Sequence, residues 1–249
     1  MRFILSALFS PLVMQIMLLG TANAKSDYQV WSHQGKPARI IELFTSEGCS
    51  SCPPADTYLS QFSTSDDLWQ GVIPLAYHVD YWDYIGWKDR FAHPSFSQKQ
   101  RLYRSYGVVA SVYTPGFVVD GKEWRGFFNP LNRTLPQASG LSAPKLQLER
   151  SKDNYSVTFL GEGALTVHIV WLVMNENTAV KNGENRGKIL HHDFIVLEQQ
   201  IKGQQAQGQT QWTFSPNDGD NNAEIDAVAV WLTKPGEFAP YQTVAGWVR

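Results

Sequence analysis

The chain has 249 residues, of which 43% are hydrophobic and 18% are charged. This balance is typical of one or two globular domains and excludes wholesale disorder. The formal net charge of -2 at pH 7 argues against nucleic acid as a partner, because binding phosphates requires a basic face.

Residues 1–24 are predicted to be a signal peptide. Arg2 precedes an apolar run, and the Ala-Asn-Ala sequence at 22–24 fits the small-x-small rule for cleavage after residue 24. The alternative is an uncleaved membrane anchor, but Pro11 and Gln15 interrupt the run and its apolar part is short for a bilayer span. We therefore expect a periplasmic or secreted protein with no stable membrane insertion after cleavage.

Between residues 25 and 138 strands and helices are predicted to alternate. The expected order is strand, helix, strand, helix and hairpin, which is typical of an α/β sheet with a parallel core and an antiparallel edge. The segments are an apolar strand at 38–45, a helix within 55–69, a strand at 71–82, a helix from about 94 to 107, and a strand at 117–119 that turns at Asp120-Gly121 into a return strand.

The character of the sequence changes after residues 139–145, which are rich in small and turn-forming residues and predict a linker. From residue 146 to residue 249, roughly seven short segments with alternating or β-branched patterns are separated by Gly, Asn, Asp and Pro. This part is predicted to be an all-β, sandwich-like domain.

Both cysteines of the chain lie in the segment "LFTSEGCSSCPP", directly after a predicted strand and before a predicted helix. Unpaired amides at a helix N-terminus stabilise a thiolate. This position suits a thiol–disulfide oxidoreductase in which Cys49 attacks a partner and Cys52 resolves the mixed disulfide. Because Pro53 and Pro54 fit only the first helical turn, we expect the helix to begin near Cys52 or Pro53.

Three alternatives compete with a redox-active pair. A purely structural disulfide across so short a gap would add little stability. A zinc site would need further ligands from His78, His191 and His192, although neighbouring residues of a strand point to opposite faces. The third alternative is a dithiol that has become inert.

Two other segments are candidates for the same site. Thr114-Pro115 heads a predicted strand, in the place where the thioredoxin fold has a cis-proline that faces its cysteine pair. The segment "HVDYWDYIGWKDRFAHP" leaves the end of another predicted strand, where loop residues gather near a ligand crevice. We therefore assign Thr114, Pro115, Trp82 and Asp80 to substrate binding, with Asp80 or Asp83 as a possible proton acceptor for Cys52.

The ordered set from about residue 38 to residue 128 resembles the thioredoxin fold. The motifs "IELFTSEGCSSCPPAD", "HVDYWDYIGWKDRFA" and "YTPGFVVDG" are similar to an exported bacterial thioredoxin-like family that is catalogued as a domain of unknown function. This resemblance implies an α/β thioredoxin-like domain at 25–138, followed by the linker at 139–145 and the β-sandwich domain at 146–249. By position it carries over Cys49 and Cys52 as the redox pair and Pro115 as the facing proline.

The sequence thus predicts an exported thiol–disulfide oxidoreductase that acts through Cys49 and Cys52. Its expected partner is a protein disulfide or a small-thiol disulfide, and no cofactor or metal is expected. A redox-inert binding or assembly protein of the cell envelope is the main alternative, and a metal-binding protein is a further one. The direction of electron flow depends on the stability of the reduced form, which the motif does not give.

Overall fold

The computed structural model describes residues 27–138, 141–203, 210–217 and 224–248. The predicted signal peptide lies outside these residues. The strands are β1 (Tyr28–Gly35), β2 (Arg39–Thr45), β3 (Val72–His78), β4 (Gly116–Val119), β5 (Lys122–Glu123), β6 (Ala143–Ser151), β7 (Asn154–Phe159), β8 (Thr166–Val173), β9 (Glu176–Ala179), β10 (Ile189–His192), β11 (Ile195–Lys202), β12 (Gln211–Phe214), β13 (Ala227–Thr233) and β14 (Gln242–Trp247). The helices are α1 (Pro53–Ser60) and α2 (Pro94–Ser105), with short 3-10 helices η1 (Gln61–Thr64), η2 (Asp80–Ile85) and η3 (Gly126–Phe128).

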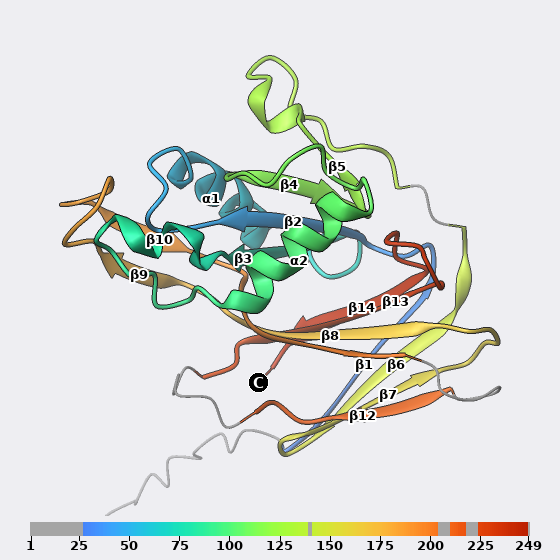
Figure 1. The fold of residues 1–249 in the computed structure, drawn as a ribbon. Helices are drawn as coiled ribbons and strands as arrows, with labels where there is room; N and C mark the ends of the chain where they lie inside the picture. Colours follow the sequence, from blue (N-terminus) through green and yellow to red (C-terminus); the bar gives the residue numbers. More distant parts are fainter. Residues whose placement is uncertain (1–26, 139–140, 204–209, 218–223, 249) are drawn as a thin grey trace, which may run out of the picture.

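The protein is mostly β, so the predicted α/β thioredoxin-like fold with a C-terminal all-β domain is wrong. Among the described residues 41% are in strands and 16% are in helices. The strands form an eight-stranded sheet in the order β14-β13-β8-β11-β3-β2-β4-β5, a four-stranded sheet in the order β1-β6-β7-β12, and a two-stranded β10-β9 pair (Figure 1).

The large sheet is continuous because β3 pairs with β11, a strand from the C-terminal part of the chain. Every residue of β3 is buried, so both edges of this strand need hydrogen-bonding neighbours. On one side β3 pairs in parallel with β2. On the other side β11 lies parallel to it, with Ile195 opposite Ala76 and a 2.8 Å hydrogen bond from the Ala76 amide to the Phe194 carbonyl.

Strands on both sides of the predicted 139–145 boundary therefore share one hydrogen-bonded sheet. The division of the chain into two domains stays a prediction, and β6 begins at Ala143, inside the predicted linker. The fold prediction failed for a physical reason. The apolar pattern of a segment indicates that it is a buried strand, but it does not indicate which other strands lie beside it in the sheet.

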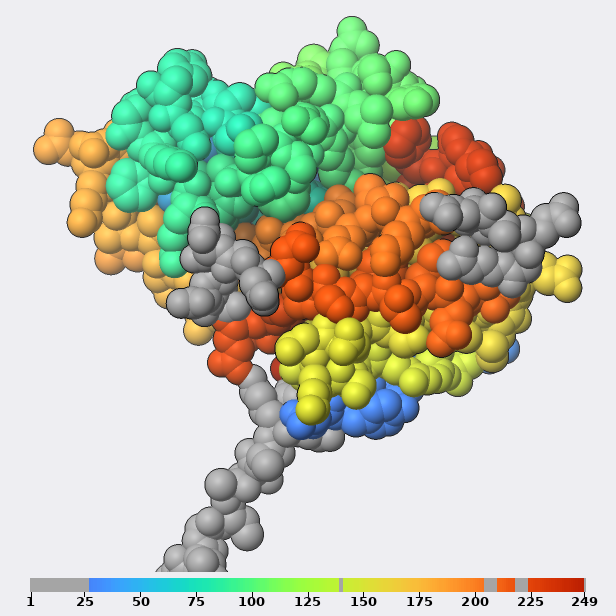
Figure 2. All heavy atoms as spheres, turned by 60° about the horizontal axis from the view of Figure 1, so that its bottom comes forward, coloured from blue at the N-terminus to red at the C-terminus, as the bar shows by residue number. Residues whose placement is uncertain are grey.

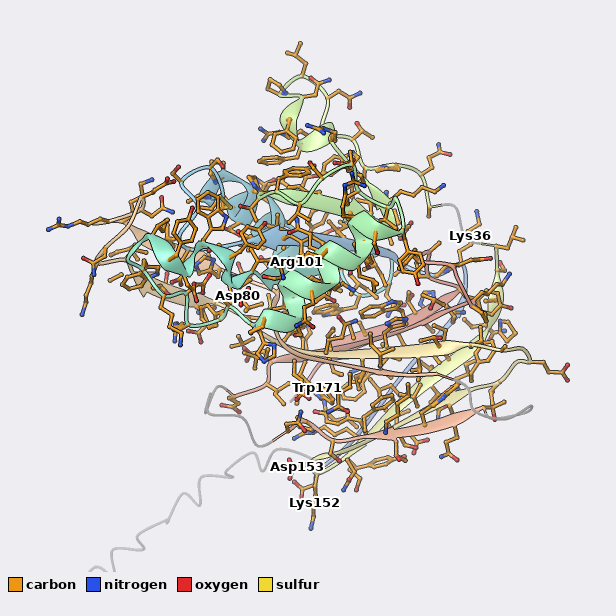
Figure 3. The ribbon with its side chains drawn as sticks, viewed as in Figure 1. Lys36, Asp80, Arg101, Lys152, Asp153 and Trp171 are labelled. Atoms are coloured by element: carbon orange, nitrogen blue, oxygen red, sulfur yellow. A yellow bond between two sulfur atoms is a disulfide. The ribbon has the colours of Figure 1, made fainter. Side chains whose placement is uncertain are left out.

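The four-stranded sheet covers one face of the C-terminal half of the large sheet. Trp171 of β8 and Tyr155 of β7 are both buried and meet edge to face, with their ring centroids 5.6 Å apart. Figure 3 shows Trp171 between the two sheets. A second core lies around β2, β3 and β4 of the large sheet and extends to β8 and β13. Helix α2 packs on one face of the sheet, where Tyr103 and Phe96 meet Phe44 and Tyr77, and α1 packs on the other face, where Tyr58 meets Phe117.

Several local predictions are confirmed. Helix α2 begins at Pro94 and ends before Gly107, whose φ is +73°. The turn between β4 and β5 has positive φ at both Asp120 and Gly121, as a two-residue hairpin of this kind requires. The polar lead-in before residue 38 is instead strand β1, which pairs with β6.

Candidate functional site

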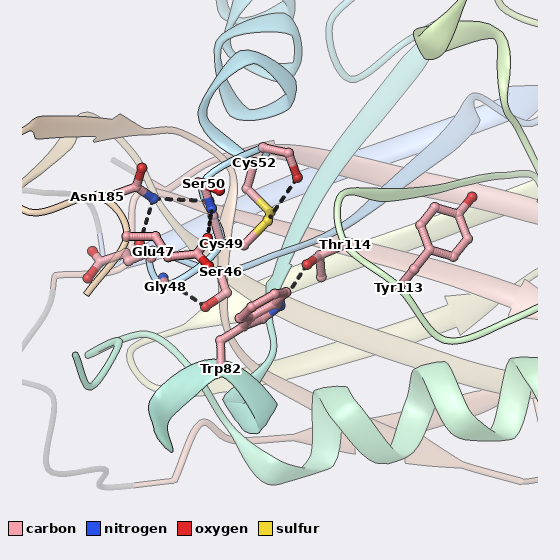
Figure 4. The surroundings of a disulfide bond; sticks show 12 residues. Ser46, Glu47, Gly48, Cys49, Ser50, Cys52, Trp82, Tyr113, Thr114 and Asn185 are labelled. Atoms are coloured by element: carbon pink, nitrogen blue, oxygen red, sulfur yellow. Dashed lines mark hydrogen bonds between the residues drawn. A yellow bond between two sulfur atoms is a disulfide. The ribbon is translucent and has the colours of Figure 1, made fainter. Parts of the chain in front are cut away.

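Cys49 and Cys52 are joined by a disulfide at the start of α1, with their Cα atoms 5.4 Å apart (Figure 4). The helix begins at Pro53, and Cys52 is its N-cap residue, which confirms the expected start. The Cys52 carbonyl accepts hydrogen bonds from the amides of Ala55 and Asp56. Cys49 is 1% exposed and Cys52 is fully buried, whereas Ser50 and Ser51 between them are exposed.

Trp82 connects the cysteine loop with the Thr114-Pro115 segment. An added Cβ on Gly48 would lie 3.0 Å from the Trp82 Cβ, so the loop backbone passes this side chain without room for another one. The Trp82 indole donates a 2.7 Å hydrogen bond to the Thr114 hydroxyl (Figure 4). The Thr114–Pro115 peptide bond is cis. Trp82, Thr114 and the cysteine loop are thus neighbours, and a role of these side chains in substrate binding stays a prediction.

The segment between β9 and β10 holds the main chain of the cysteine loop. Asn185 is fully buried, and its amide donates hydrogen bonds to the carbonyls of Glu47 (2.8 Å) and Cys49 (3.0 Å). The neighbouring Glu184 carboxylate accepts a 3.2 Å bond from the Ser50 amide. The hydrogen bonds from Ser50 lower the pKa of Glu184. These contacts fix the loop from a position more than 130 residues away in the sequence.

We expect Asn185→Ala to destabilise the oxidised protein by roughly 2–3 kcal/mol, because it leaves the buried Glu47 carbonyl without a donor and removes one of the two hydrogen bonds to the Cys49 carbonyl. Asn182→Ala is the matched control, since Asn182 lies in the same loop and is exposed. Denaturant unfolding of both variants measures the difference. Equal stability of the two variants would mean that Asn185 does not hold the cysteine loop.

Buried ionisable side chains gather behind the cysteine loop. Glu47 and His192 are buried, and Glu47 Oε1 lies 3.5 Å from His192 Nε2. The other carboxylate oxygen of Glu47 accepts a 2.7 Å bond from the Trp87 indole. The ring of His78 packs edge to face against the ring of His192 at 5.0 Å.

Asp89 and His78 form a fully buried pair within this cluster, 2.7 Å apart from Oδ2 to Nδ1. Burial alone would raise the pKa of Asp89, but the nearby His78 and hydrogen bonds from the Glu47 and Phe91 amides outweigh it and lower the pKa. The Glu47 amide lies 2.9 Å from Asp89 Oδ2. Asp89 therefore ties the loop that precedes Cys49 to the buried cluster.

Asp56 is a further buried carboxyl group near this cluster, and its pKa is raised, whereas that of Asp89 is lowered. It lies in the first turn of α1 and is 6% exposed. Burial raises its pKa from 3.8 to about 7, while the charge of His192 acts in the opposite direction. A carboxyl group that titrates near neutral pH can act as a proton donor or acceptor.

Not all of the predicted side chains meet at the disulfide. Asp80 contacts α2 instead, where its amide and carboxylate both bond the Ser97 hydroxyl; Figure 3 shows Asp80 close to α2. Asp83 accepts a 3.2 Å bond from the Asp89 amide, and burial raises its pKa. A proton-accepting role for Asp80 or Asp83 stays a prediction.

The two adjacent histidines of β10 point to opposite sides, as expected for a strand. His191 is exposed and lies 3.0 Å from the Asp193 carboxylate, whereas His192 is buried. In the part of the chain that the structure describes, no group of three or more His, Cys, Asp or Glu side chains has a geometry suited to a metal ion. Within those same residues, no helix is both long and apolar enough to span a bilayer.

Sequence reasoning missed most of the side chains behind the disulfide. Glu47, Asp56 and Asp89 lie within the quoted motifs but had no role assigned to them, and Asn185 was not singled out. The roles of all four depend on burial. A usable signal was the short sequence "ENRGKILHH", which places polar residues directly before strand β10, in which Leu190 and His192 are buried. His192 was considered in the sequence as one of the further ligands that a zinc site would need.

The fold and the site define a mostly β protein with a buried disulfide at a helix N-terminus. The chain belongs to the family described as protein of unknown function, DUF1223, whose model matches residues 40–233. This confirms the predicted resemblance to a domain of unknown function, although the thioredoxin-like fold that the resemblance implied is wrong.

Two solved structures are similar to this chain. A protein from Agrobacterium tumefaciens has 25% sequence identity and a TM-score of 0.59, and the match covers 87% of this chain and 96% of that one. HBP35 of Porphyromonas gingivalis has 14% identity and a TM-score of 0.51, with 85% and 75% covered; this similarity concerns the fold alone. A search of the curated proteins found no match.

Proposed function

We propose that this protein is an exported thiol–disulfide oxidoreductase that exchanges its Cys49–Cys52 disulfide with the thiols of a protein or a small molecule. The observation that carries the proposal is the position of the disulfide at the N-terminus of α1. A helix N-terminus stabilises the thiolate that exchange requires. Export is supported by the signal-peptide pattern of the first 24 residues and by the disulfide itself.

Stability alone does not account for this disulfide. The chain-entropy relation gives about 2 kcal/mol for so small a ring, less than the ~3 kcal/mol of a 15-residue loop. Yet the loop is held by Asn185, Glu184 and Asp89. These hydrogen bonds hold the loop more firmly than the small stabilising effect of the disulfide would require. Such an arrangement is typical of a reactive site, in which the sulfur atoms must be held in one geometry.

The reaction with a dithiol partner has two steps. A partner thiolate attacks the Cys49 sulfur, the Cys49–Cys52 bond breaks, and Cys52 leaves as a thiolate. The second partner thiolate then attacks the partner sulfur of the mixed disulfide, and Cys49 leaves. The partner loses two electrons and two protons, and the protein becomes a dithiol. The reverse sequence reduces a partner disulfide.

The leaving thiolate of Cys52 is buried, and burial disfavours its negative charge. It must therefore take up a proton or be stabilised by nearby positive charge. Asp56 lies four residues along α1 and titrates near pH 7. In this proposal Asp56 supplies that proton, either directly or through neighbouring buried polar groups. Ser51, whose hydroxyl lies 3.4 Å from the Cys49 sulfur, offers a hydrogen bond to the other thiolate.

The proposal is tested by equilibrating the purified protein with reduced and oxidised glutathione and measuring the fraction of disulfide by alkylation and mass spectrometry. We expect reversible reduction under native conditions and accelerated oxidation of a peptide dithiol by the oxidised protein. A disulfide that stays intact across the whole range of buffers, with no acceleration, would leave the binding or assembly protein as the better explanation.

A further inference from the structure

A cavity of about 550 Å³ lies between α2 and the face of the large sheet formed by β8, β11 and β13. Its lining includes no residue of the cysteine loop. Figure 2 shows the corresponding face, where the green atoms of α2 and the red atoms that follow β13 border the orange atoms of β11. The cavity is within the size range of small-molecule sites.

The floor of the cavity is a pair of stacked rings. Trp231 of β13 and His168 of β8 are directly opposite each other in the sheet, and their rings are parallel to within 2° at 4.9 Å. Tyr103, Tyr106 and Phe238 form an aromatic wall, with ring centroids 5.2 Å (Tyr103–Phe238) and 5.4 Å (Tyr106–Phe238) apart. Such surfaces favour a flat ring, which can stack on one face or meet an edge.

Two buried polar atoms belong to lining residues and have no hydrogen-bond partner among the described residues. They are His168 Nδ1 and Gln199 Nε2. The other ring nitrogen of His168 lies 3.1 Å from the Thr233 hydroxyl. Burial and the charge of Lys99 lower the pKa of His168 to about 3, so its ring is neutral. Unpartnered buried polar atoms are rare, and a ligand with polar groups would satisfy them.

The lining offers two ammonium groups to an anion, one of which is already paired with Glu42. Two lysines, Lys99 and Lys234, line the cavity against one glutamate, Glu237. The Lys99 ammonium pairs with Glu42 at 2.9 Å and lies 5.8 Å from the centroid of the Trp231 ring. An ammonium has three donors, so Lys99 can bind a second carboxylate beside that of Glu42.

We propose that this cavity binds a small planar aromatic carboxylate. Its ring packs against Trp231, His168 and the aromatic wall, and its carboxylate lies near the lysines and accepts a hydrogen bond from Gln199. This site is separate from the disulfide, and the proposal does not depend on thiol exchange.

The test uses 2-naphthoate and its uncharged analogue 2-naphthamide as probes, with binding to the full protein measured by calorimetry. We expect the carboxylate to bind at least about tenfold more tightly than the amide, because an ion pair contributes to the charged ligand alone. Gln199→Leu should weaken naphthoate binding about tenfold. The same variant should not lower the melting temperature of the free protein, because Gln199 Nε2 has no partner there to lose.

Lys234→Met should weaken the binding of naphthoate but not of naphthamide, and Lys122→Met, an exposed lysine outside the cavity, is its matched control. Any of three results would overturn the proposal: no binding of naphthoate at millimolar concentration, equal affinity for the two probes, or affinities that Gln199→Leu and Lys234→Met leave unchanged. A lowered melting temperature for free Gln199→Leu would instead assign Gln199 a structural role, and would also count against the site.

Discussion

Replacing Cys49 with serine is expected to abolish thiol–disulfide exchange, whereas replacing Cys52 is expected to trap the partner. With Cys49→Ser the thiolate that attacks the peptide disulfide is missing, so no mixed disulfide forms. With Cys52→Ser the Cys49 thiol still forms a mixed disulfide, but no second thiol can release the partner. The measurement is non-reducing electrophoresis and mass spectrometry after incubation with a peptide disulfide.

The asymmetry between the two variants follows from their surroundings. Cys49 precedes the exposed residues Ser50 and Ser51, so in this proposal the partner approaches the cysteine pair from the side of Cys49. Cys52 is fully buried and caps α1. The double variant Cys49→Ser with Cys52→Ser is the control, and it should remain folded because the small ring contributes only about 2 kcal/mol. Equal trapping by both single variants would contradict the assigned roles.

Local structure around the cysteines was predictable because it depends on nearby residues. Pro53 and Pro54 fit the first turn of a helix but not its interior, and α1 begins at Pro53. Asp120-Gly121 tolerates positive φ, and the hairpin forms there. Trp82 and Thr114 were assigned to the same site because each follows or heads a strand at one end of the sheet, and they are hydrogen-bonded to each other.

The overall fold was not predictable in this way, because strand pairing is a long-range property. The residues of β3 and β11 give no sign that they will lie side by side, although Ile195 and Ala76 are neighbours in the sheet. The same pairing brings β10 and its preceding loop to the cysteines. Asn185 and His192 reach the site only through this arrangement, so the sequence alone did not assign them to the surroundings of the disulfide.

The free energy of unfolding is expected to fall between about pH 4 and pH 7, and Asp56→Asn should remove part of that fall. Burial raises the pKa of Asp56 from 3.8 to about 7. In this window the folded protein keeps a proton that the unfolded chain has lost, so stability decreases as the pH rises. At about 1.36 kcal/mol per pH unit, the contribution lost is about 4 kcal/mol by pH 8.

An asparagine in place of Asp56 does not ionise. The free energy of unfolding of the Asp56→Asn variant should therefore increase relative to that of the wild type as the pH rises. Its stability relative to wild type should increase by about 4 kcal/mol between pH 4 and pH 8, as measured by denaturant unfolding of the oxidised proteins. Burial also raises the pKa of Asp120 to about 6, but this group is present in both proteins and cancels in the difference. Asp153→Asn, which changes an exposed carboxyl on the β6–β7 turn, is the control. A difference between Asp56→Asn and wild type that stays constant from pH 4 to pH 8 would mean that Asp56 is charged in the folded protein, and it could not then supply the proton to Cys52 at neutral pH.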